Sequence, residues 1–254
     1  MDERQDELYL LEEKYNGVKS EAFYADCKRL ALGEPLAYLI GHIPFLDTTI
    51  YLDSRPLIPR PETEYWTKEV IETLTKSTPS LGLDTDQPLH VLDLCAGSGC
   101  IGVAIAQAIP EAYVDFSEIE KRHIATIEKN LVENKISKDR TNVYHTNLFS
   151  NLTQKYDIII SNPPYIDSTL NRVHESVVDF EPHLSLFGGK EGMDVITEII
   201  TQAPKHLVRG GQLWLEHEPE QTPAITTLAL NNGFTTVTHK DQYNVERYTI
   251  LMLQ

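Results

Sequence analysis

From residue 89 onwards, short apolar segments that suit β-strands alternate with longer segments of helical periodicity. Strands are predicted at 89–94, 112–117, 142–145, 156–161, 212–217, 234–239 and 246–253, and helices at 99–108, 119–134, 192–207 and 221–232. This alternation is typical of an α/β fold with a doubly wound, mostly parallel sheet, here of seven strands. Because no helix separates the last two strands, we expect an antiparallel strand at the C-terminus.

The residues before this region follow a different pattern. Apolar side chains at helical spacing predict helices at 4–15 and 20–32, and β-forming residues predict a small hairpin at 37–53. The segment Arg55–Pro61 holds three prolines and cannot form a regular element, whereas Pro61 suits the first turn of a helix at 61–76. We therefore expect a short helical domain at 1–35, a β-hairpin linker at 36–58 and the α/β domain at 59–254.

Composition excludes several classes of protein. Lysine and arginine number 22 against 38 aspartate and glutamate residues, a net charge of −16 that disfavours non-specific binding to nucleic acid or anionic lipid. No apolar run approaches the ~18 residues of a spanning helix, and the acidic start resembles neither a signal peptide nor a transit peptide, so we expect a cytoplasmic protein. The three cysteines and nine histidines lack zinc-site spacing, and we predict no metal site.

A loop of small residues follows the strand at 89–94. The sequence Val91–Ile101 reads VLDLCAGSGCI, in which Gly97 and Gly99 allow backbone N–H groups at a helix start to approach a ligand closely. A tight turn with packing glycines is the alternative interpretation. The loop lacks the lysine of a P-loop and the complete G-x-G-x-x-G pattern, which disfavours NTP and NAD binding.

Glu118 comes at the end of the next predicted strand, about 20 residues after the glycine loop. A carboxylate at this position can accept hydrogen bonds from both hydroxyls of a ribose. Alone, Glu118 would more simply be a solvated acid at a helix start. Its spacing from the glycine loop favours the ribose interpretation.

The most specific motif is Ser161-Asn162-Pro163-Pro164-Tyr165, which directly follows an apolar strand. The two prolines stiffen the loop, because they remove two N–H donors and fix the backbone. They leave the side-chain carbonyl of Asn162 and the backbone carbonyl of Pro163 as acceptors, while the ring of Tyr165 can supply a flat wall. Such a set suits a planar –NH2 group.

Several segments then resemble one known family, the HemK/PrmC family of S-adenosylmethionine-dependent methyltransferases. Asn162–Tyr165 matches the NPPY motif of amino-group methyltransferases, which DNA adenine methyltransferases share. The other matching segments are Gly33–Tyr38 (GEPLAY), Leu57–Glu64 (LIPRPETE), Phe180–Pro182 (FEP), Gly188–Asp194 (GGKEGMD), and Asn244, Glu246 and Arg247 near the end. The resemblance runs from Gly33 to the C-terminus, with the motifs in the order of the family.

The resemblance implies a Rossmann-like class I methyltransferase fold and methylation of the side-chain amide (N5) of the glutamine in the GGQ loop of peptide-chain release factors. The cofactor would be S-adenosyl-L-methionine, with S-adenosyl-L-homocysteine as product. The implied cofactor-binding residues are Cys95, Ala96, Gly97, Ser98, Gly99, Glu118, Asn147, Leu148 and Asn162. The implied catalytic residues are Asn162, Pro163 and Tyr165, which with Pro164 would also bind the substrate.

The resemblance further implies the release factor as partner. We expect a monomer, and no direct contact with nucleic acid because the net charge of −16 counts against it. The family usually has several helices where this chain has only the two that precede Gly33. Two other substrates remain open for the same chemistry, a ribosomal-protein glutamine and adenine N6 of nucleic acid. A non-catalytic protein that binds a translation factor is the alternative from a different class. Gly210-Gly211-Gln212 spells the substrate motif within the chain itself, and we expect only a helix-to-strand turn there.

Overall fold

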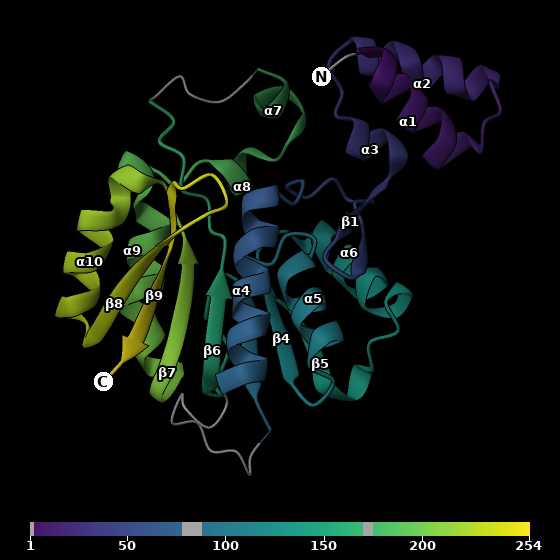
Figure 1. The fold of residues 1–254 in the computed structure, drawn as a ribbon. Coiled ribbons are helices and arrows are strands. Elements are labelled where there is room, and N and C mark those ends of the chain that lie inside the picture. Colours follow the sequence, from purple (N-terminus) through teal and green to yellow (C-terminus); the bar gives the residue numbers. More distant parts are fainter. Residues whose placement is uncertain (1–2, 78–87, 170–174) are drawn as a thin grey trace.

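A seven-stranded sheet forms the centre of the computed structural model, which describes residues 3–77, 88–169 and 175–254 (Figure 1). The strands are β3 (His90–Leu94), β4 (Tyr113–Glu118), β5 (Thr141–His145), β6 (Tyr156–Ser161), β7 (Leu207–Glu216), β8 (Phe234–Lys240) and β9 (Glu246–Leu253). Their order is β5-β4-β3-β6-β7-β9-β8, and β9 alone runs antiparallel to its neighbours. The predicted sheet, with its antiparallel strand near the C-terminus, is confirmed.

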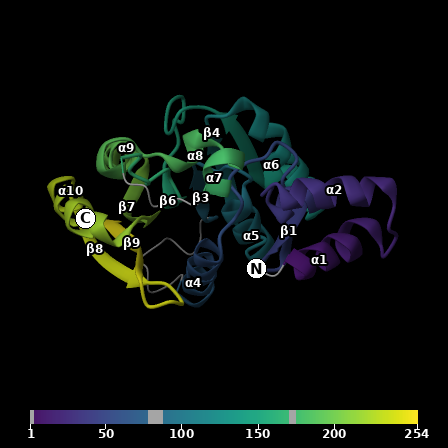
Figure 2. The same ribbon diagram turned by 90° about the horizontal axis from the view of Figure 1, so that it is seen from above.

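Helices cover both faces of this sheet. On one face lie α4 (Pro61–Ser77), α5 (Cys100–Ala108) and α6 (Lys121–Glu133), and on the other lie α9 (Asp194–Gln202) and α10 (Thr222–Asn231) (Figure 2). Successive strand residues point to opposite faces, so that Val91 and Ile158 join the first core whereas Leu92 and Ile159 join the second. Burial on both faces explains why these strands are apolar runs rather than alternating ones.

Three helices at the N-terminus, α1 (Glu3–Tyr15), α2 (Glu21–Ala31) and α3 (Leu36–Ile40), form a small unit of their own. Figure 1 shows them in purple, to one side of the sheet. Leu10, Leu11, Phe23 and Leu39 form a separate apolar cluster among them. The predicted helices 4–15 and 20–32 are therefore found, and a third, short helix completes their core.

The prediction of a hairpin at 37–53 is wrong for its first residues. Residues 36–40 form α3, because Pro35 precedes its first turn, Leu39 packs against α1 and α2, and Gly41 ends the helix with φ 96°. The hairpin itself consists of β1 (His42–Phe45) and β2 (Thr48–Tyr51). The hairpin contacts α6 through the buried Asn130, which exchanges two hydrogen bonds with the backbone of Tyr51. Asn130 also donates to the carbonyl of Ser98 in the glycine loop.

Two other predicted regions differ from the structure. No helix is predicted between the strand at 156–161 and the helix at 192–207, but the structure has α7 (Glu175–Phe180) and α8 (His183–Leu186) there, and residues 170–174 lie outside the described part. The helix predicted at 192–207 ends at Gln202, because a 3₁₀ turn with Pro204 follows it.

The segment Gly210-Gly211-Gln212 lies within β7 rather than in a helix-to-strand turn. The pairing of β7 with β6 shifts register between Tyr156 and Ile158, which leaves room for the two glycines. Gln212 is only 4% exposed, and its side-chain oxygen accepts from Nε1 of Trp214. This glutamine is therefore a structural residue of the sheet.

The remaining short elements are 3₁₀ turns, η1 (Lys138–Arg140), η2 (Lys190–Gly192), η3 (Ala203–Lys205) and η4 (Pro219–Gln221). Within the described ranges, none of the helices is both long and apolar enough to cross a membrane.

A buried histidine marks the contact between the linker and α6. His123 has no exposed surface, and its Nδ1 lies 2.7 Å from Oγ of Ser54, whereas Nε2 is without a hydrogen-bond partner among the described residues. Burial lowers the pKa of His123 from 6.5 to about 4. The folded chain therefore keeps this imidazole neutral where the unfolded chain would protonate it.

We expect acid to weaken the fold through His123. The unfolded chain binds this proton below about pH 6.5 and the folded chain only below about pH 4, so the stability is intact above pH 6.5 and falls by about 3 kcal/mol as the pH drops to 4. Urea unfolding should be compared at pH 7 and pH 4.5 for the wild type and for His123→Gln, which cannot titrate. An equal loss in both proteins would contradict this role for His123.

Candidate active site

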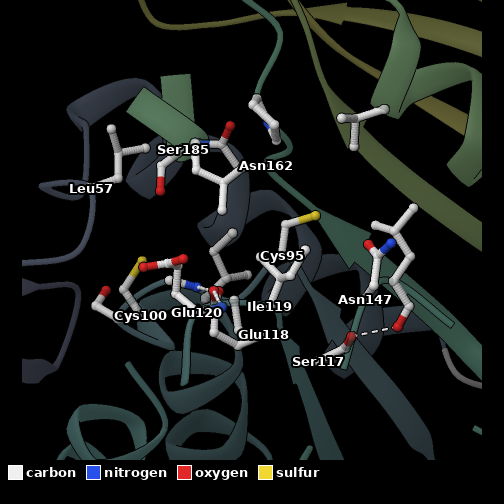
Figure 3. A pocket seen from close by; sticks show the side chains of 18 of the residues that line it. Leu57, Cys95, Cys100, Ser117, Glu118, Ile119, Glu120, Asn147, Asn162 and Ser185 are labelled. Carbon is white, nitrogen blue, oxygen red and sulfur yellow. Dashed lines mark hydrogen bonds between the residues drawn. The ribbon is translucent and has the colours of Figure 1, made fainter. Parts of the chain in front are cut away.

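A cavity opens at the carboxyl ends of β3, β4 and β6, where the strand order of the sheet reverses. This crevice is where open α/β sheets bind ligands, because the connections after two neighbouring strands leave toward opposite faces of the sheet there and leave space between their loops. The residues that line it are Leu57, Pro59, Thr63, Cys95, Ala96, Gly97, Ser98, Cys100, Ile101, Ser117, Glu118, Ile119, Glu120, Thr146, Asn147, Leu148, Asn162, Pro164, Leu184, Ser185 and Val195. Figure 3 shows Cys95, Glu118, Asn147 and Asn162 around the same space.

Most of the site residues predicted from sequence meet at this cavity. Its lining includes Cys95 to Ser98 from the loop after β3, Glu118 at the end of β4, Asn147 and Leu148 after β5, and Asn162 and Pro164 after β6. Three predicted residues do not line it, namely Gly99, Pro163 and Tyr165. Segments that are far apart in the sequence are thus brought to one place by the parallel strands.

The loop after β3 owes its shape to residues with left-handed backbone conformations. Cys95 has φ 62°, Gly97 has φ 57° and Gly99 has φ 78°, of which only Cys95 carries a Cβ. A Cβ at Gly97 would meet nothing within 4 Å, whereas one at Gly99 would lie 3.1 Å from Ile127 of α6. Gly99 is therefore a packing position that starts α5, and Gly97 is the position that faces open space.

The carboxylate of Glu118 is 5% exposed and is held by two backbone groups. The N–H of Gly97 donates to Oε2 and the N–H of Glu120 to Oε1, both at 2.7 Å. Burial raises the pKa of Glu118, while the two N–H donors counteract part of that rise by favouring the charged form. Each carboxylate oxygen keeps a free lone pair, so a fixed pair of acceptors faces the cavity.

Asn162 has one side of its amide engaged. Its Nδ2 donates to Oγ1 of Thr63 at 3.1 Å, which leaves its carbonyl oxygen as an acceptor at the cavity. Tyr165, three residues later, donates its hydroxyl to Oε1 of Glu216 at 3.0 Å. Tyr165 therefore anchors the loop to β7 rather than forming part of the cavity lining in this structure.

The glycine-rich segment at 188–194 packs directly beneath the NPPY loop. The side-chain nitrogen of Gln221 donates both to the carbonyl of Tyr165, at 2.9 Å, and to that of Glu191, at 3.0 Å. A Cβ on Gly188 or Gly192 would overlap the backbone carbonyls of Pro164 and Tyr165, respectively. Because these glycines have no side chains, the two backbone segments are in direct contact, and this contact fixes the position of the NPPY loop.

Two further segments line the cavity and were not predicted to do so. Leu57 and Pro59 come from the proline-rich segment, and Leu184 and Ser185 come from α8. Glu181 joins these two walls, because its carboxylate accepts from the N–H of Ile58 and pairs with Arg60 at 2.6 Å.

Asp93 lies within the segment VLDLCAGSGCI but was not predicted as a site residue. It lies on β3 with no exposed surface, and its Oδ2 accepts from the N–H of Gly102 at 2.8 Å. Oδ1 has no partner among the described residues, and burial raises the pKa of Asp93 to about 8. An acidic residue within the apolar run Val91–Leu94 was the signal that could have identified it. Among the described residues, no group of three or more histidine, cysteine or acidic side chains could hold a metal ion.

Comparison with known proteins supports the fold. The Methyltransferase small domain family matches residues 76–179. The solved structure of a ribosomal protein L11 methylase from Lactobacillus delbrueckii subsp. bulgaricus has the same fold, with a TM-score of 0.56, 17% sequence identity, and coverage of 80% of this chain and 82% of that one.

Two curated relatives are closer in sequence. A release factor glutamine methyltransferase from Rhodopirellula baltica is 35% identical over 216 residues, which cover 84% of this chain and 71% of the relative. A bifunctional methyltransferase from Rickettsia felis is 31% identical over 89% of this chain, but the chain spans only 47% of that longer protein. With its sheet, its glycine loop and its NPPY motif in the family arrangement, the chain belongs to the release factor glutamine methyltransferase family.

Proposed function

We propose that this protein transfers the methyl group of S-adenosyl-L-methionine to the side-chain amide nitrogen of the glutamine in the GGQ loop of a peptide-chain release factor. Family membership supports the reaction, and one observation supports the site. The carbonyl side of the Asn162 amide lies at the same cavity as the glycine loop and Glu118. An acceptor for an –NH2 group and a candidate nucleoside site therefore share one space.

The residues present fit the cofactor. The two free acceptor positions of Glu118 suit the two ribose hydroxyls, and the open space at Gly97 suits the methionine end. Asn147 offers an amide oxygen to the adenine amino group beside the apolar side chain of Leu148. When bound, the sulfonium supplies an activated methyl electrophile, so the protein needs no metal and no covalent nucleophile for this step.

The protein's own task is to present the glutamine amide correctly. An amide nitrogen is a weak nucleophile because its lone pair is delocalised into its carbonyl. Asn162, through its side-chain oxygen, and Pro163, through its backbone carbonyl, would accept the two hydrogens of the amide –NH2 and turn the nitrogen toward the methyl group. Most of the acceleration would come from this alignment and from dipoles already oriented for the transition state. The methylated nitrogen is acidic and loses its proton without a strong base.

The proposal is tested by mass spectrometry of a purified release factor after incubation with the protein and S-adenosyl-L-methionine. The expected result is a mass gain of one methyl group on the GGQ glutamine, which forms about 10²-fold more slowly with Asn162→Ala. Methylation of a ribosomal-protein glutamine or of adenine in place of the release factor would overturn the assignment of the substrate. Failure to consume the cofactor with any of these would favour a non-catalytic protein.

We expect Glu118→Ala to weaken the binding of S-adenosyl-L-methionine by about 1.5–3 kcal/mol, the usual contribution of hydrogen bonds to a charged acceptor. Titration calorimetry measures this directly. Glu111→Ala is the matched control, because Glu111 is an exposed glutamate that precedes the same strand. Unchanged affinity in Glu118→Ala would leave Glu118 as a residue that merely caps the turn with Gly97 and Glu120.

The N-terminal helices are the proposed docking surface for the body of the release factor, away from its GGQ loop. They expose several large apolar side chains, among them Tyr9 at 53% and Tyr24 at 55%. Contacts remote from the reaction strengthen binding equally in the ground and transition states, so they lower KM rather than raise kcat.

We therefore expect the double variant Tyr9→Ser/Tyr24→Ser to raise the KM for the intact release factor about tenfold and to leave a GGQ peptide unaffected. Steady-state kinetics with both substrates provides the comparison. Val237→Ser, which alters an apolar side chain that is 59% exposed on β8, is the control. If factor and peptide are affected alike, the docking surface lies elsewhere, and residues 175–186 beside the NPPY loop become the better candidate.

A further inference from the structure

A chain of hydrogen bonds stands behind Asn162, on the side away from its free oxygen. Nδ2 of Asn162 donates to Oγ1 of Thr63 at 3.1 Å, and that hydroxyl donates to Oε2 of Glu216 at 2.7 Å. Thr63 lies in the first turn of α4, and Glu216 is the last residue of β7. The chain therefore links the catalytic loop to a helix and a strand that are distant from it in sequence.

We propose that Thr63 and Glu216 are positioning residues that fix the side-chain amide of Asn162 with its oxygen toward the substrate and its nitrogen away from it. The inference rests on the proposed function, because it assigns what holds the acceptor of the glutamine –NH2 group in place. Neither residue needs to touch the reacting atoms for this role. An amide rotated by half a turn would present a donor to a donor and could not bind the substrate.

The direction of donation along this series of hydrogen bonds follows from Trp66. Its indole Nε1 can only donate, and it donates to the same Oε2 of Glu216 at 2.6 Å. Ionised Glu216 has no proton to donate, so its Oε2 accepts from both Trp66 and Thr63. The hydroxyl proton of Thr63 is committed to Oε2, so the Thr63 oxygen can only accept, and it selects the –NH2 end of Asn162.

The side chains that make these hydrogen bonds are buried, which leaves the hydroxyl of Thr63 no other hydrogen-bond partner in the described part of the chain. Glu216 is 1% exposed, Thr63 is 2% exposed and Trp66 is not exposed at all. Water cannot supply an alternative donor or acceptor within the chain, and an unmade hydrogen bond there is costly. Oε1 of Glu216 accepts from Tyr165, so the same carboxyl group also fixes the last residue of the NPPY motif.

The first test uses the matched pair Thr63→Val and Thr63→Ser. Valine has nearly the shape of threonine without the hydroxyl, and serine keeps the hydroxyl. We expect valine to lower kcat about tenfold, with the affinity for S-adenosyl-L-methionine within about twofold of wild type, and serine to restore most of the rate. Thr75→Val, at an exposed threonine of the same helix, is the control.

A double-mutant cycle separates positioning from a general structural effect. If Thr63 acts through Asn162, the loss of kcat caused by valine should disappear once Asn162 is already alanine. An equal loss in both backgrounds, or a serine variant as slow as the valine variant, would overturn the proposal.

A spectroscopic readout keeps the inference testable even if the enzyme serves another substrate. With ¹⁵N-labelled asparagine, the side-chain –NH2 resonance of Asn162 is identified by its loss in Asn162→Ala. We expect this resonance to shift and its protons to exchange faster in Thr63→Val, and to stay in place in Thr63→Ser and in Glu216→Gln, where the amide carbonyl can replace Oε2. An unmoved resonance in Thr63→Val would overturn the positioning role whatever the protein methylates, whereas a moved resonance without methylation of a release factor would count against the proposed function alone.

Discussion

Replacing Asn162 with alanine is expected to lower the rate of methyl transfer about 10²-fold or more while the protein still binds S-adenosyl-L-methionine. The variant removes one oriented acceptor at the reacting nitrogen, and the loss of a single preorganised hydrogen-bonding group of this kind costs a factor of this size. The expected signature is a fall in the single-turnover rate with the cofactor bound at saturation. Titration calorimetry should give a cofactor affinity close to that of the wild type.

Two further variants sharpen this result. Asn162→Asp keeps an acceptor oxygen but loses the –NH2 group that Thr63 accepts from, and it should also be slow because its charge draws the carboxylate toward the sulfonium. Asn231→Ala alters an exposed asparagine at the end of α10 and should be as active as the wild type. A single-turnover rate of Asn162→Ala within a few-fold of wild type would remove Asn162 from the chemistry.

Much of the fold could be predicted because its strands are buried on both faces. Segments such as Tyr156–Ser161 are short, mostly apolar runs, which are typical of strands buried on both faces. The helices between the strands show clear periodicity. The errors fell where tertiary contacts decide the local structure. Residues 36–40 contain good β-formers, yet they are helical because Leu39 completes the core of α1 and α2.

The candidate site, too, could be predicted from the sequence only in part. Its glycine loop, Glu118 and Asn162 each end or follow a strand, and parallel strands bring their carboxyl ends to one edge. Thr63 lies in the family-matching segment Leu57–Glu64, but nothing local in the sequence predicts its contact with Glu216, which is 153 positions away in the chain. Sequence patterns report local periodicity and spacing, whereas the partners of a buried polar group depend on how the layers pack.

Gly192 shows how this packing reaches the NPPY loop. It has φ 68°, and a Cβ there would overlap the carbonyl oxygen of Tyr165 and lie 2.5 Å from Nε2 of Gln221. The neighbour that would have to move is therefore the backbone of the NPPY motif itself. Gln221 could not yield without giving up its hydrogen bonds to Tyr165 and Glu191.

We expect Gly192→Ala to destabilise the fold by about 2–5 kcal/mol, the sum of a left-handed alanine and an overpacked contact. We also expect it to lower kcat about 10²-fold, since a displacement of the loop by about 1 Å is enough for such a loss. Urea unfolding and single-turnover kinetics measure the two effects. Gly210→Ala is the matched control, because Gly210 has a similar φ of 78° but nothing within 4 Å of its would-be Cβ. It should show only the backbone strain, about 1–2 kcal/mol, with an unchanged rate. If the two alanine variants behave alike, the contact between Gly192 and Tyr165 does not position the NPPY loop, and the glycine-rich segment shapes only its own turn.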